Sequence, residues 1–440
     1  MTAIGWPDAR RIARAVGSPL DRIDVALSDA LGATLAAPLV ALSPLPAYDA
    51  AAMDGYAVSG AGPWQVVGRV LAGDPTPVAP LRPGTAVEIA TGALVPAGAD
   101  AVLPYERARC RADRMHGEIE PGRHIRRRGD DCPLGERVLP AGSLVTPALL
   151  GLAASLGHDR LAVFRRPRVG VVVTGAELLS AGLPSPGRVR DAIGPLLPGL
   201  VHAAGGEIAW TVRVTDDQAA LVDAIRRPGA DVTVVCGATS VGAADHLRAA
   251  LDAVAALVRV HGVACRPGHP QLLATTADGR AVIGLPGNPY AALVAGLTLL
   301  APLLGRLAGR VDRPPVTARL TGPVKVLDRD TRLVPVARVG SVVVPVGHDR
   351  PGLLWGAAEA HALAVVPPGW QGAEVELLAL PGAEAAATVP VVVAAADPAQ
   401  PLQQPPDGPE AGTTGAGTAV GASGIGRSEE RLPAAAGAEA

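Results

Sequence analysis

Residues 168–174 read RVGVVVT, a short apolar run that is almost uninterrupted. β-Branched runs of this kind are typical of strands buried on both faces of a parallel sheet. Two similar runs follow, DVTVVC at 231–236 and AVIGL at 281–285, and segments with helical spacing separate them. The alternation predicts an open three-layer α/β sheet with helices on both faces. The other elements expected here are a strand at 207–214 and helices at 196–204, 218–226, 244–257 and 289–307.

The sequence on either side of this region has a different texture. The first forty residues are predicted to be mainly helical, as two short helices separated by Gly17-Ser18-Pro19. Short β-rich runs with turn residues occupy 64–140, and a helix is expected at 147–157. Residues 316–393 return to short strands and predict a small β-barrel. The tail that follows has almost no large apolar residue and is predicted to be disordered.

These patterns predict a multidomain α/β and β protein. The central α/β domain is flanked by N-terminal helical and β modules and by the C-terminal barrel. The expected domains are a discontinuous N-terminal linker domain (1–45 and 135–165), an inserted β-rich domain (46–134), the α/β domain (166–310), the barrel (311–393) and the tail (394–440).

Composition narrows the class of protein. The chain of 440 residues has a formal charge of −2, which predicts neither nucleic-acid binding nor binding to an anionic membrane. The four cysteines have no paired spacing, which argues against a zinc ribbon or a disulfide framework and favours reduced thiols in the cytoplasm. The most apolar stretch, 291–304, is interrupted by Gly296 and Pro302 and is predicted to be too short to span a bilayer.

Three of the predicted strands run into loops suited to close ligand approach. The loops are Gly175-Ala176-Glu177, the stretch 237–242 followed by Asp245, and Pro286-Gly287-Asn288-Pro289, which opens a helix. Ligands of open α/β sheets bind at the carboxyl ends of the strands, where glycine and helix N-termini favour anions. One such loop is more often a simple tight turn. Three loops on one edge, two of them with a carboxylate, favour a phosphorylated ligand with a divalent cation.

The polar loop 265–270 leaves two interpretations open. Arg266 and His269 could face an anion, or the loop could be a solvated turn stiffened by its two prolines. Farther towards the N-terminus, Asp54-Gly55 and Thr91-Gly92 are turns with polar side chains inside two unusually specific segments, 46–58 and 90–102.

Seven segments in order resemble one family. They are AMDGYAV at 52–58, TGALVPAGADAV at 91–102, RRRGDD at 126–131, VVVTGAELL at 171–179, SVGAAD at 240–245, RPGHP at 266–270 and GLPGNP at 284–289. Together they resemble the molybdopterin molybdenumtransferase family, which includes bacterial MoeA and the E domain of gephyrin. The resemblance extends from about residue 8 to about residue 385.

The resemblance implies an elongated homodimer of four-domain subunits. The active site would lie between the α/β, molybdopterin-binding domain of one subunit and the N-terminal modules of the other. The family takes adenylylated molybdopterin and molybdate, hydrolyses the phosphoanhydride with Mg²⁺, inserts molybdenum into the dithiolene and releases AMP. The implied partners are these small molecules and other proteins of molybdenum cofactor biosynthesis, in the cytoplasm, with neither nucleic acid nor membrane.

The resemblance also implies roles for individual residues. The positions that match the family's catalytic residues are Asp54, Thr91, Glu177, Asp216 and Asp245. Glu177 and Asp245 would also hold Mg²⁺, because carboxylates suit this ion. The positions that match the cofactor-binding loops are Gly175, Gly237, Ser240, Gly242, Arg266, His269, Pro286, Gly287, Asn288 and Pro289.

Three positions depart from the family pattern around the expected anion site. Gly262 and His269 stand where the family carries lysines, and Ala291 stands where it often carries serine. The chain has one lysine, Lys325, among 39 basic residues, but a bias towards arginine does not explain glycine or histidine. Two hypotheses follow: an active molybdenumtransferase with a modified molybdate pocket, or an impaired paralogue that binds molybdopterin or acts as a scaffold.

Overall fold

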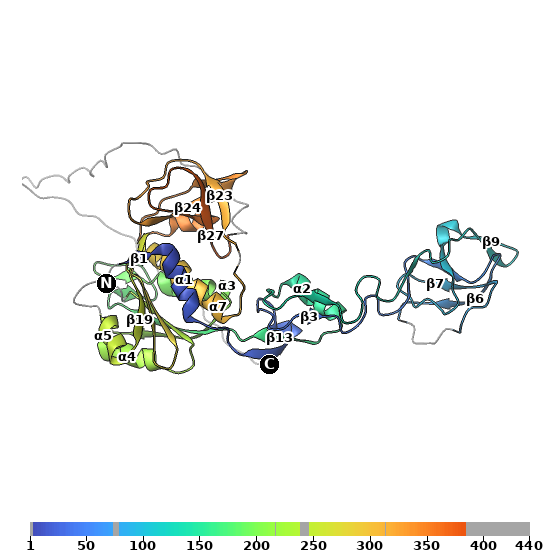
Figure 1. The fold of residues 1–440 in the computed structure, drawn as a ribbon, viewed down its shortest axis with the longest axis horizontal. Helices are drawn as coiled ribbons and strands as arrows, with labels where there is room; N and C mark the ends of the chain where they lie inside the picture. The colour runs from blue at the N-terminus through green and yellow to red at the C-terminus, as the bar shows by residue number, and fades with distance from the viewer. Residues whose placement is uncertain (1–2, 74–78, 216, 238–245, 313, 384–440) are drawn as a thin grey trace, which may run out of the picture. The chain divides into compact units, whose positions relative to one another are not determined.

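The computed structural model describes residues 3–73, 79–215, 217–237, 246–312 and 314–383, shown as a ribbon in Figure 1. The chain divides into two compact units, Met1–Ala394 and Ala395–Ala440, and all the described residues belong to the first. The tail predicted to be disordered, 394–440, lies outside the described residues.

A six-stranded sheet forms the centre of the α/β region. Its order is β17 (Glu207–Val214), β14 (Arg168–Thr174), β18 (Val232–Cys236), β22 (Ala281–Leu285), β21 (Leu272–Thr275) and β19 (Leu257–His261). The first four strands are parallel, and β21 and β19 add an antiparallel edge. The four parallel strands were predicted from sequence. The helix expected at 244–257 is shorter than predicted. Helix α5 (His246–Ala253) ends at Ala253, and the edge strand β19 begins at Leu257, where LVRVH alternates as a half-buried strand does.

Strand connectivity fixes where a ligand would bind. The chain passes from β14 to its neighbour β17 and then returns to β18 on the other side of β14. The strand order therefore reverses at β14. In open α/β sheets, the crevice at the carboxyl ends of the strands beside such a switch point is the usual ligand site.

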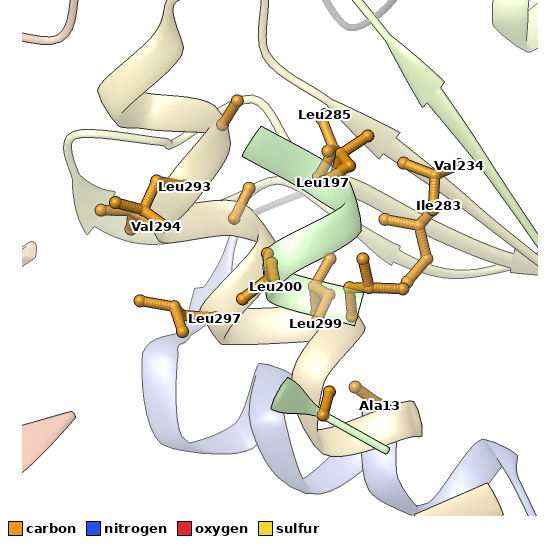
Figure 2. Packing of buried hydrophobic residues seen from close by; sticks show 14 of the residues in the cluster. Ala13, Leu197, Leu200, Val234, Ile283, Leu285, Leu293, Val294, Leu297 and Leu299 are labelled. Atoms are coloured by element: carbon orange, nitrogen blue, oxygen red, sulfur yellow. The ribbon is translucent and has the colours of Figure 1, made fainter. Parts of the chain in front are cut away.

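The two faces of the sheet pack against different helices. Val171 and Val173 of β14 join a core with α3 and the 289–307 helix, whereas Val172 packs with α4 and α5. Figure 2 shows the first of these cores, where Leu197 and Leu200 approach the long apolar helix and the sheet. The helices are α3 (Ile193–Ala203), α4 (Gln218–Arg226), α5 (His246–Ala253) and α6 (Pro289–Ala295), which continues through a π-helical turn (Gly296–Leu300) into α7 (Ala301–Leu307).

The helix 289–307 is a core element. By length and composition it could cross a membrane, which corrects the expectation that this stretch is too short, but 83% of its apolar window is buried inside the protein. The π-helical turn is fixed by the N-terminal helix, since the Trp6 indole N–H donates to Thr298 Oγ1 at 3.1 Å. Gly296 allows Leu200 to pack closely, because a Cβ there would lie 2.5 Å from Leu200 Cδ2 and displace it.

The C-terminal strands close into the predicted small β-barrel. Five strands form the ring, because β24 pairs with both β25 and β26, and β23 and β27 complete it. Two short strands from elsewhere extend this sheet, since β20 pairs with β24 and β1 pairs with β20. The elements are β1 (Ile4–Gly5), β20 (Val263–Arg266), β23 (Val316–Leu320), β24 (Thr331–Val339), β25 (Val342–Pro345), α8 (Trp355–Glu359), β26 (Ala362–Val366) and β27 (Ala373–Ala379).

The N-terminal segment contains one helix, not the predicted two. Helix α1 spans Trp6–Val16, but Arg22–Ala26 is the strand β2, which pairs antiparallel with β13 (Arg160–Phe164). The β-branched Ile23 and Val25 favour this strand, and its partner lies far away in sequence. The same module contains a 3₁₀ turn (Leu27–Asp29), β3 (Leu39–Val40), β12 (Arg137–Leu139) and α2 (Pro147–Ser155), which Thr146 caps.

The inserted residues form the predicted β-rich module. Its main sheet has the order β6 (Gln65–Val70), β7 (Thr85–Ile89), β5 (Gly55–Val58) and β8 (Ala101–Pro104). Gly55 is required between strands, because a Cβ there would lie 2.1 Å from Leu103 O. The remaining elements are β4 (Ala50–Ala51), a 3₁₀ turn (Tyr105–Arg107), β9 (Arg109–Arg111), β10 (Arg114–His116) and β11 (Ile125–Arg126).

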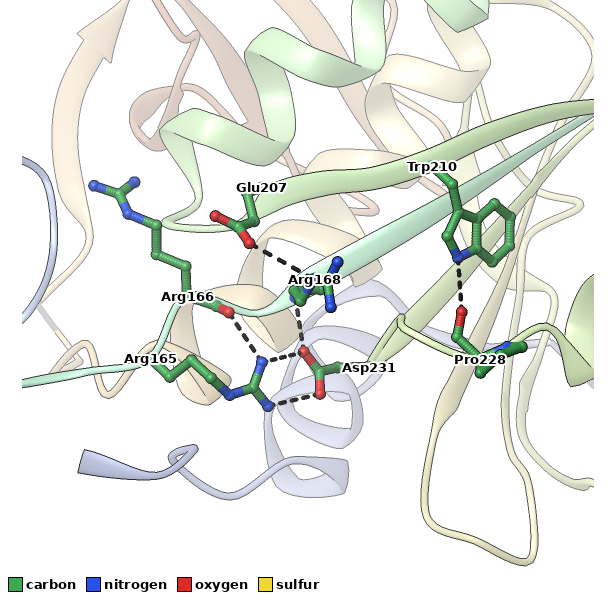
Figure 3. A network of polar contacts seen from close by, with 7 residues as sticks. All are labelled: Arg165, Arg166, Arg168, Glu207, Trp210, Pro228 and Asp231. Atoms are coloured by element: carbon green, nitrogen blue, oxygen red, sulfur yellow. Dashed lines mark hydrogen bonds and ion pairs between the residues drawn. The ribbon is translucent and has the colours of Figure 1, made fainter. Parts of the chain in front are cut away.

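A polar network joins β13 to the first strands of the α/β sheet (Figure 3). Arg165 donates two hydrogen bonds of 2.9 Å to the Asp231 carboxylate, and the Arg168 backbone N–H adds a third at 2.7 Å. Burial raises the pKa of the Asp231 carboxyl, but these three hydrogen bonds outweigh it, so the net pKa is lowered. The network therefore stabilises the folded chain with Asp231 ionised.

The variant Asp231→Asn should lower the free energy of unfolding by about 1–2 kcal/mol, because it removes a charge-assisted bidentate pair. A carboxyl with a lowered folded pKa stabilises above its unfolded pKa and loses that contribution as pH falls through the folded pKa. The difference from the parent should therefore be constant at neutral pH and shrink below about pH 3.8. Urea melts across pH measure it. Asp223→Asn, on the exposed face of α4, is the matched control, and an equal effect of the two variants would contradict the assignment.

Candidate active site at the carboxyl edge of the sheet

The ends of β14, β18 and β22 meet in backbone contact. Thr174 Oγ1 donates to Cys236 O at 3.2 Å, and the Gly237 N–H donates to Leu285 O at 3.1 Å. A Cβ added at Gly237 would lie 3.2 Å from Thr174 O, and one at Gly287 would lie 3.8 Å from the Gly237 Cα. The structure thus brings together two of the predicted glycines, Gly237 and Gly287, which leave the backbone open to a ligand.

Glu177 folds back over Gly175 beside these strand ends. A Cβ at position 175 would lie 2.9 Å from both oxygens of the Glu177 carboxylate, and Gly175 has a φ of 133°, which favours glycine. The Glu177 carbonyl accepts the Val189 N–H at 2.9 Å, which joins the turn to the short pair β15 (Leu178–Leu179) and β16 (Val189–Arg190). The side chain is exposed, and within the described residues its carboxylate accepts no hydrogen bond.

Asp191 is a carboxylate of this edge that sequence reasoning did not assign to the site. Its side chain is only 7% exposed and receives Arg213 Nη2 at 2.7 Å. It also accepts the first backbone N–H groups of α3, from Ile193 at 3.1 Å and Gly194 at 2.9 Å. Burial and then the Asp191 charge raise the pKa of the Cys236 thiol, so the carboxylate lies near the end of β18. An aspartate just before a helix is the signal that could have identified it.

Only part of the loop 286–289 is open to a ligand. Pro286 is buried, whereas Gly287 and Asn288 are exposed. The first amides after Pro289 are already used, because Tyr290 N and Ala291 N donate to Pro351 O at 2.9 and 3.3 Å. The start of α6 is thus capped by a loop of the barrel, and Gly287 and Asn288 are the positions of this loop exposed for a ligand.

The loop 265–270 lies between the small β-barrel and the start of α6, since a Cβ at Gly268 would lie 3.1 Å from Ala291 O. It follows β20, which pairs with β1 and β24 and not with the α/β sheet. Arg266 forms an ion pair with Asp330, from Nε to Oδ2 at 3.0 Å. The ring of His269 is half-buried, and its Nδ1 is buried without a partner among the described residues.

Gly262 lies next to His269 and has a conformational reason to be glycine. Its φ is 78°, in the left-handed region, and a Cβ there would lie 3.8 Å from His269 Nε2. Lysine at this position would be strained, since residues other than glycine rarely adopt this φ. Ala291 is only 3% exposed, so a hydroxyl at this position would be removed from bulk water. Two of the three departures therefore follow from local geometry.

A second cluster lies in the β-rich module. Asp54 Oδ1 accepts the Thr91 backbone N–H at 2.6 Å and the Thr91 hydroxyl at 2.9 Å, and these two hydrogen bonds lower the pKa of the Asp54 carboxyl. Tyr48 Oη donates to Gly92 O at 3.2 Å beside them. The structure therefore brings Asp54 and Thr91 together, and within the described residues their hydrogen bonds stay inside the β-rich module.

Arg127 and Asp49 organise the neighbouring RRRGDD segment. The Asp49 carboxylate accepts the Arg128 backbone N–H at 2.8 Å and Arg127 Nη1 at 2.7 Å, and these bonds lower the pKa of Asp49. This part of the motif is thus a paired, exposed loop.

Four predicted site residues, Asp216, Ser240, Gly242 and Asp245, lie outside the described residues. Among the residues that are described, no three His, Cys, Asp or Glu side chains are grouped closely enough to hold a metal ion. Mg²⁺ usually binds one or two carboxylates together with substrate phosphates and water, and an exposed carboxylate such as that of Glu177 fits this chemistry.

Comparison with known proteins agrees with this architecture. Residues 4–157 match the MoeA N-terminal region (domain I and II), and residues 170–306 match the probable molybdopterin binding domain. The structure superimposes on a crystal structure of the molybdopterin biosynthesis MoeA protein from Pyrococcus horikoshii with a TM-score of 0.71 and 27% identity, covering 86% of this chain and 99% of that one. The fold and the strand-end site thus define a MoeA-like multidomain protein.

Curated relatives narrow the assignment. The chain is 38% identical over 326 residues to molybdopterin molybdenumtransferase 2 of Mycobacterium tuberculosis, covering 68% of this chain and 80% of the relative. It is 28% identical over 380 residues to the molybdopterin molybdenumtransferase of Staphylococcus aureus strain Mu50, covering 81% and 89%. The chain belongs to the molybdopterin molybdenumtransferase family.

The variant Thr91→Ala should raise the pKa of Asp54 towards its ordinary value. It removes the hydroxyl donor and keeps the backbone donor, so only part of the lowering should be lost. Carboxyl ¹³C NMR titration measures the shift. Thr85→Ala is the control, because its hydroxyl donates to Arg82 O in the same module. An unchanged Asp54 titration in Thr91→Ala would contradict the geometry.

Proposed function

We propose that this chain is a molybdopterin molybdenumtransferase, which inserts molybdate-derived molybdenum into adenylylated molybdopterin and releases AMP. The observation that carries the proposal is the convergence of β14, β18 and β22 at a strand-order switch point, with Glu177 and Asp191 beside the exposed loops. The family membership and the shared name of the relatives support the same activity.

The strand-end residues have distinct roles in this proposal. Gly175, Gly237 and Gly287 allow a pyrophosphate and pterin to approach the backbone without a side chain in the way. Asp191 is held by Arg213 and the α3 amides, and its backbone N–H donates to Leu179 O at 3.1 Å, which anchors the turn that carries Glu177. Glu177 orients the attacking water at the phosphoanhydride.

The proposed metal is Mg²⁺, held by Glu177 and Asp245. When bound, it supplies positive charge that neutralises the phosphoanhydride. The exposed Glu177 carboxylate, which accepts no hydrogen bond within the described residues, supports this role because Mg²⁺ prefers such oxygen ligands.

We also propose the finer organisation that the sequence predicted. The α/β domain, at 166–310, would be a three-layer domain within a cytoplasmic homodimer. The Asp54–Thr91 pair is exposed and makes its contacts inside its own module, as expected for residues offered to the site of the other subunit. The 46–134 module would therefore complete the site of the partner, with Asp216, Ser240 and Gly242 in their family roles.

The altered anion site is compatible with activity. Gly262 and Ala291 follow from backbone geometry and burial, which leaves His269 as the substitution with a chemical effect. The impaired-paralogue hypothesis is not favoured, since the relatives share the transferase name.

AMP release tests the proposal directly. Purified protein supplied with adenylylated molybdopterin, Mg²⁺ and molybdate should release AMP in a molybdate-dependent manner, measured by chromatography. Glu177→Gln should lower the rate on the order of a hundredfold, because the carboxylate acts on the reacting phosphate. Glu136→Gln, an exposed residue outside the site, should leave the rate unchanged. No AMP release by the parent protein, even in excess molybdate, would refute the proposed activity.

Gly175→Ala should lower the rate at least about tenfold while the fold is retained. The added methyl would lie 2.9 Å from both Glu177 oxygens, and the φ of 133° is strained for alanine. Gly182→Ala is the control, because its φ of 82° is also positive but its Cβ meets nothing within 4 Å. If Gly182→Ala lowers the rate as much as Gly175→Ala does, the assay detects backbone strain and not displacement of Glu177.

A further inference from the structure

A second cavity lies away from the strand-end site. It has a volume of about 1120 Å³ and is bounded by α1, α3, the 289–307 helix and the end of β27. None of its described lining residues belongs to the strand-end loops. Its walls are largely apolar and include Leu200, Leu297, Pro302, Leu378 and Leu380.

The charges around this cavity are mainly positive. Four arginines line it, and the one carboxylate among its described lining residues, Asp312, is held by Arg14 at 2.5 Å. The Arg10 guanidinium lies 5.0 Å from the Trp6 ring and donates to Leu297 O at 2.7 Å, but within the described residues it forms no ion pair. Burial lowers the pKa of Arg10, which indicates that its charge is partly removed from water.

His361 also lines the cavity. Its Nδ1 accepts the Arg338 backbone N–H at 2.8 Å, so the neutral ring must carry its proton on Nε2. That Nε2 is buried and has no partner among the described residues. Because this atom is closed to solvent, His361 contributes a wall of the cavity and not a contact to a ligand.

Arg338 stands at the exposed side of the cavity. Its guanidinium forms no hydrogen bond or ion pair in the part of the chain that the structure describes. It is therefore the cationic group with most freedom to receive an anion from solvent.

We propose that this cavity binds a small organic anion with an apolar body, such as a medium-chain carboxylate. The carboxylate lies against Arg338, Arg10 adds positive charge to the cavity, and the apolar body packs on the leucine walls. Charge-assisted hydrogen bonds in a partly dehydrated setting give affinity, and the walls select for an apolar body. The volume of about 1120 Å³ is slightly above the roughly 300–1,000 Å³ of most ligand pockets, so a medium-chain carboxylate fits with room for water.

Isothermal titration of the full chain with three probes tests the proposal. Octanoate carries both features, 1-octanol only the apolar body, and acetate only the carboxylate. Octanoate should bind at one site per chain, at least about tenfold more tightly than either other probe, because only it uses both kinds of contact. No octanoate binding at millimolar concentration, or equal binding of octanoate and octanol, would overturn the proposal.

Two variants locate the site. Arg338→Met keeps an apolar stem and should weaken octanoate binding roughly tenfold without changing octanol binding. Arg319→Met, an exposed arginine of β23 outside the cavity, is the matched control and should bind as the parent does. Ala379→Glu, at an exposed wall position, should also weaken octanoate by repulsion. If Arg338→Met and Ala379→Glu both bind octanoate as tightly as Arg319→Met does, this cavity is excluded as the octanoate site.

Discussion

The parallel pairing of β14 is the constraint on which the rest of the site depends. β14 lies between β17 and β18, and its register pairs Val173 with Cys236, while Cys236 pairs with Leu285 of β22. Three strands therefore end at the same level, and the three loops that follow must share one small volume. The burial of β14 on both faces fixes this register, because helical cores on each side accept alternate residues of the strand.

The crowding at these strand ends explains where the chain uses glycine. At Gly175 a side chain would collide with the carboxylate that the site needs, and at Gly296 it would collide with the helix that supports the sheet. At Gly262 the backbone itself adopts a left-handed φ of 78°. A glycine that looks like a lost lysine in the sequence is therefore a requirement of the backbone conformation.

The sequence predicted elements whose signal is local. The strands at 168–174, 207–214 and 281–285 were predicted with the observed bounds, because uninterrupted or alternating apolar runs are visible in a short window. Arg22–Ala26 was wrongly predicted as a helix because its pairing partner, Arg160–Phe164, lies in a distant segment. The Asp191–Arg213 and Arg266–Asp330 ion pairs depend on contacts between elements, which no window of sequence contains, although the position of Asp191 just before α3 is a local signal.

The distribution of positive charge gives the chain two different environments for anions. At the described strand ends two arginines are already paired, Arg213 with Asp191, and Arg266 beyond them with Asp330. Backbone groups and a metal ion would therefore share in holding a phosphate there, which suits a ligand that arrives with its own Mg²⁺. The cavity beside α1 has the opposite character, with arginines that outnumber its carboxylate and walls too apolar for a solvated phosphate chain. The basic residues of the chain are almost all arginine, and this suits the cavity beside α1. A guanidinium keeps its charge next to apolar walls, where burial would neutralise an ammonium.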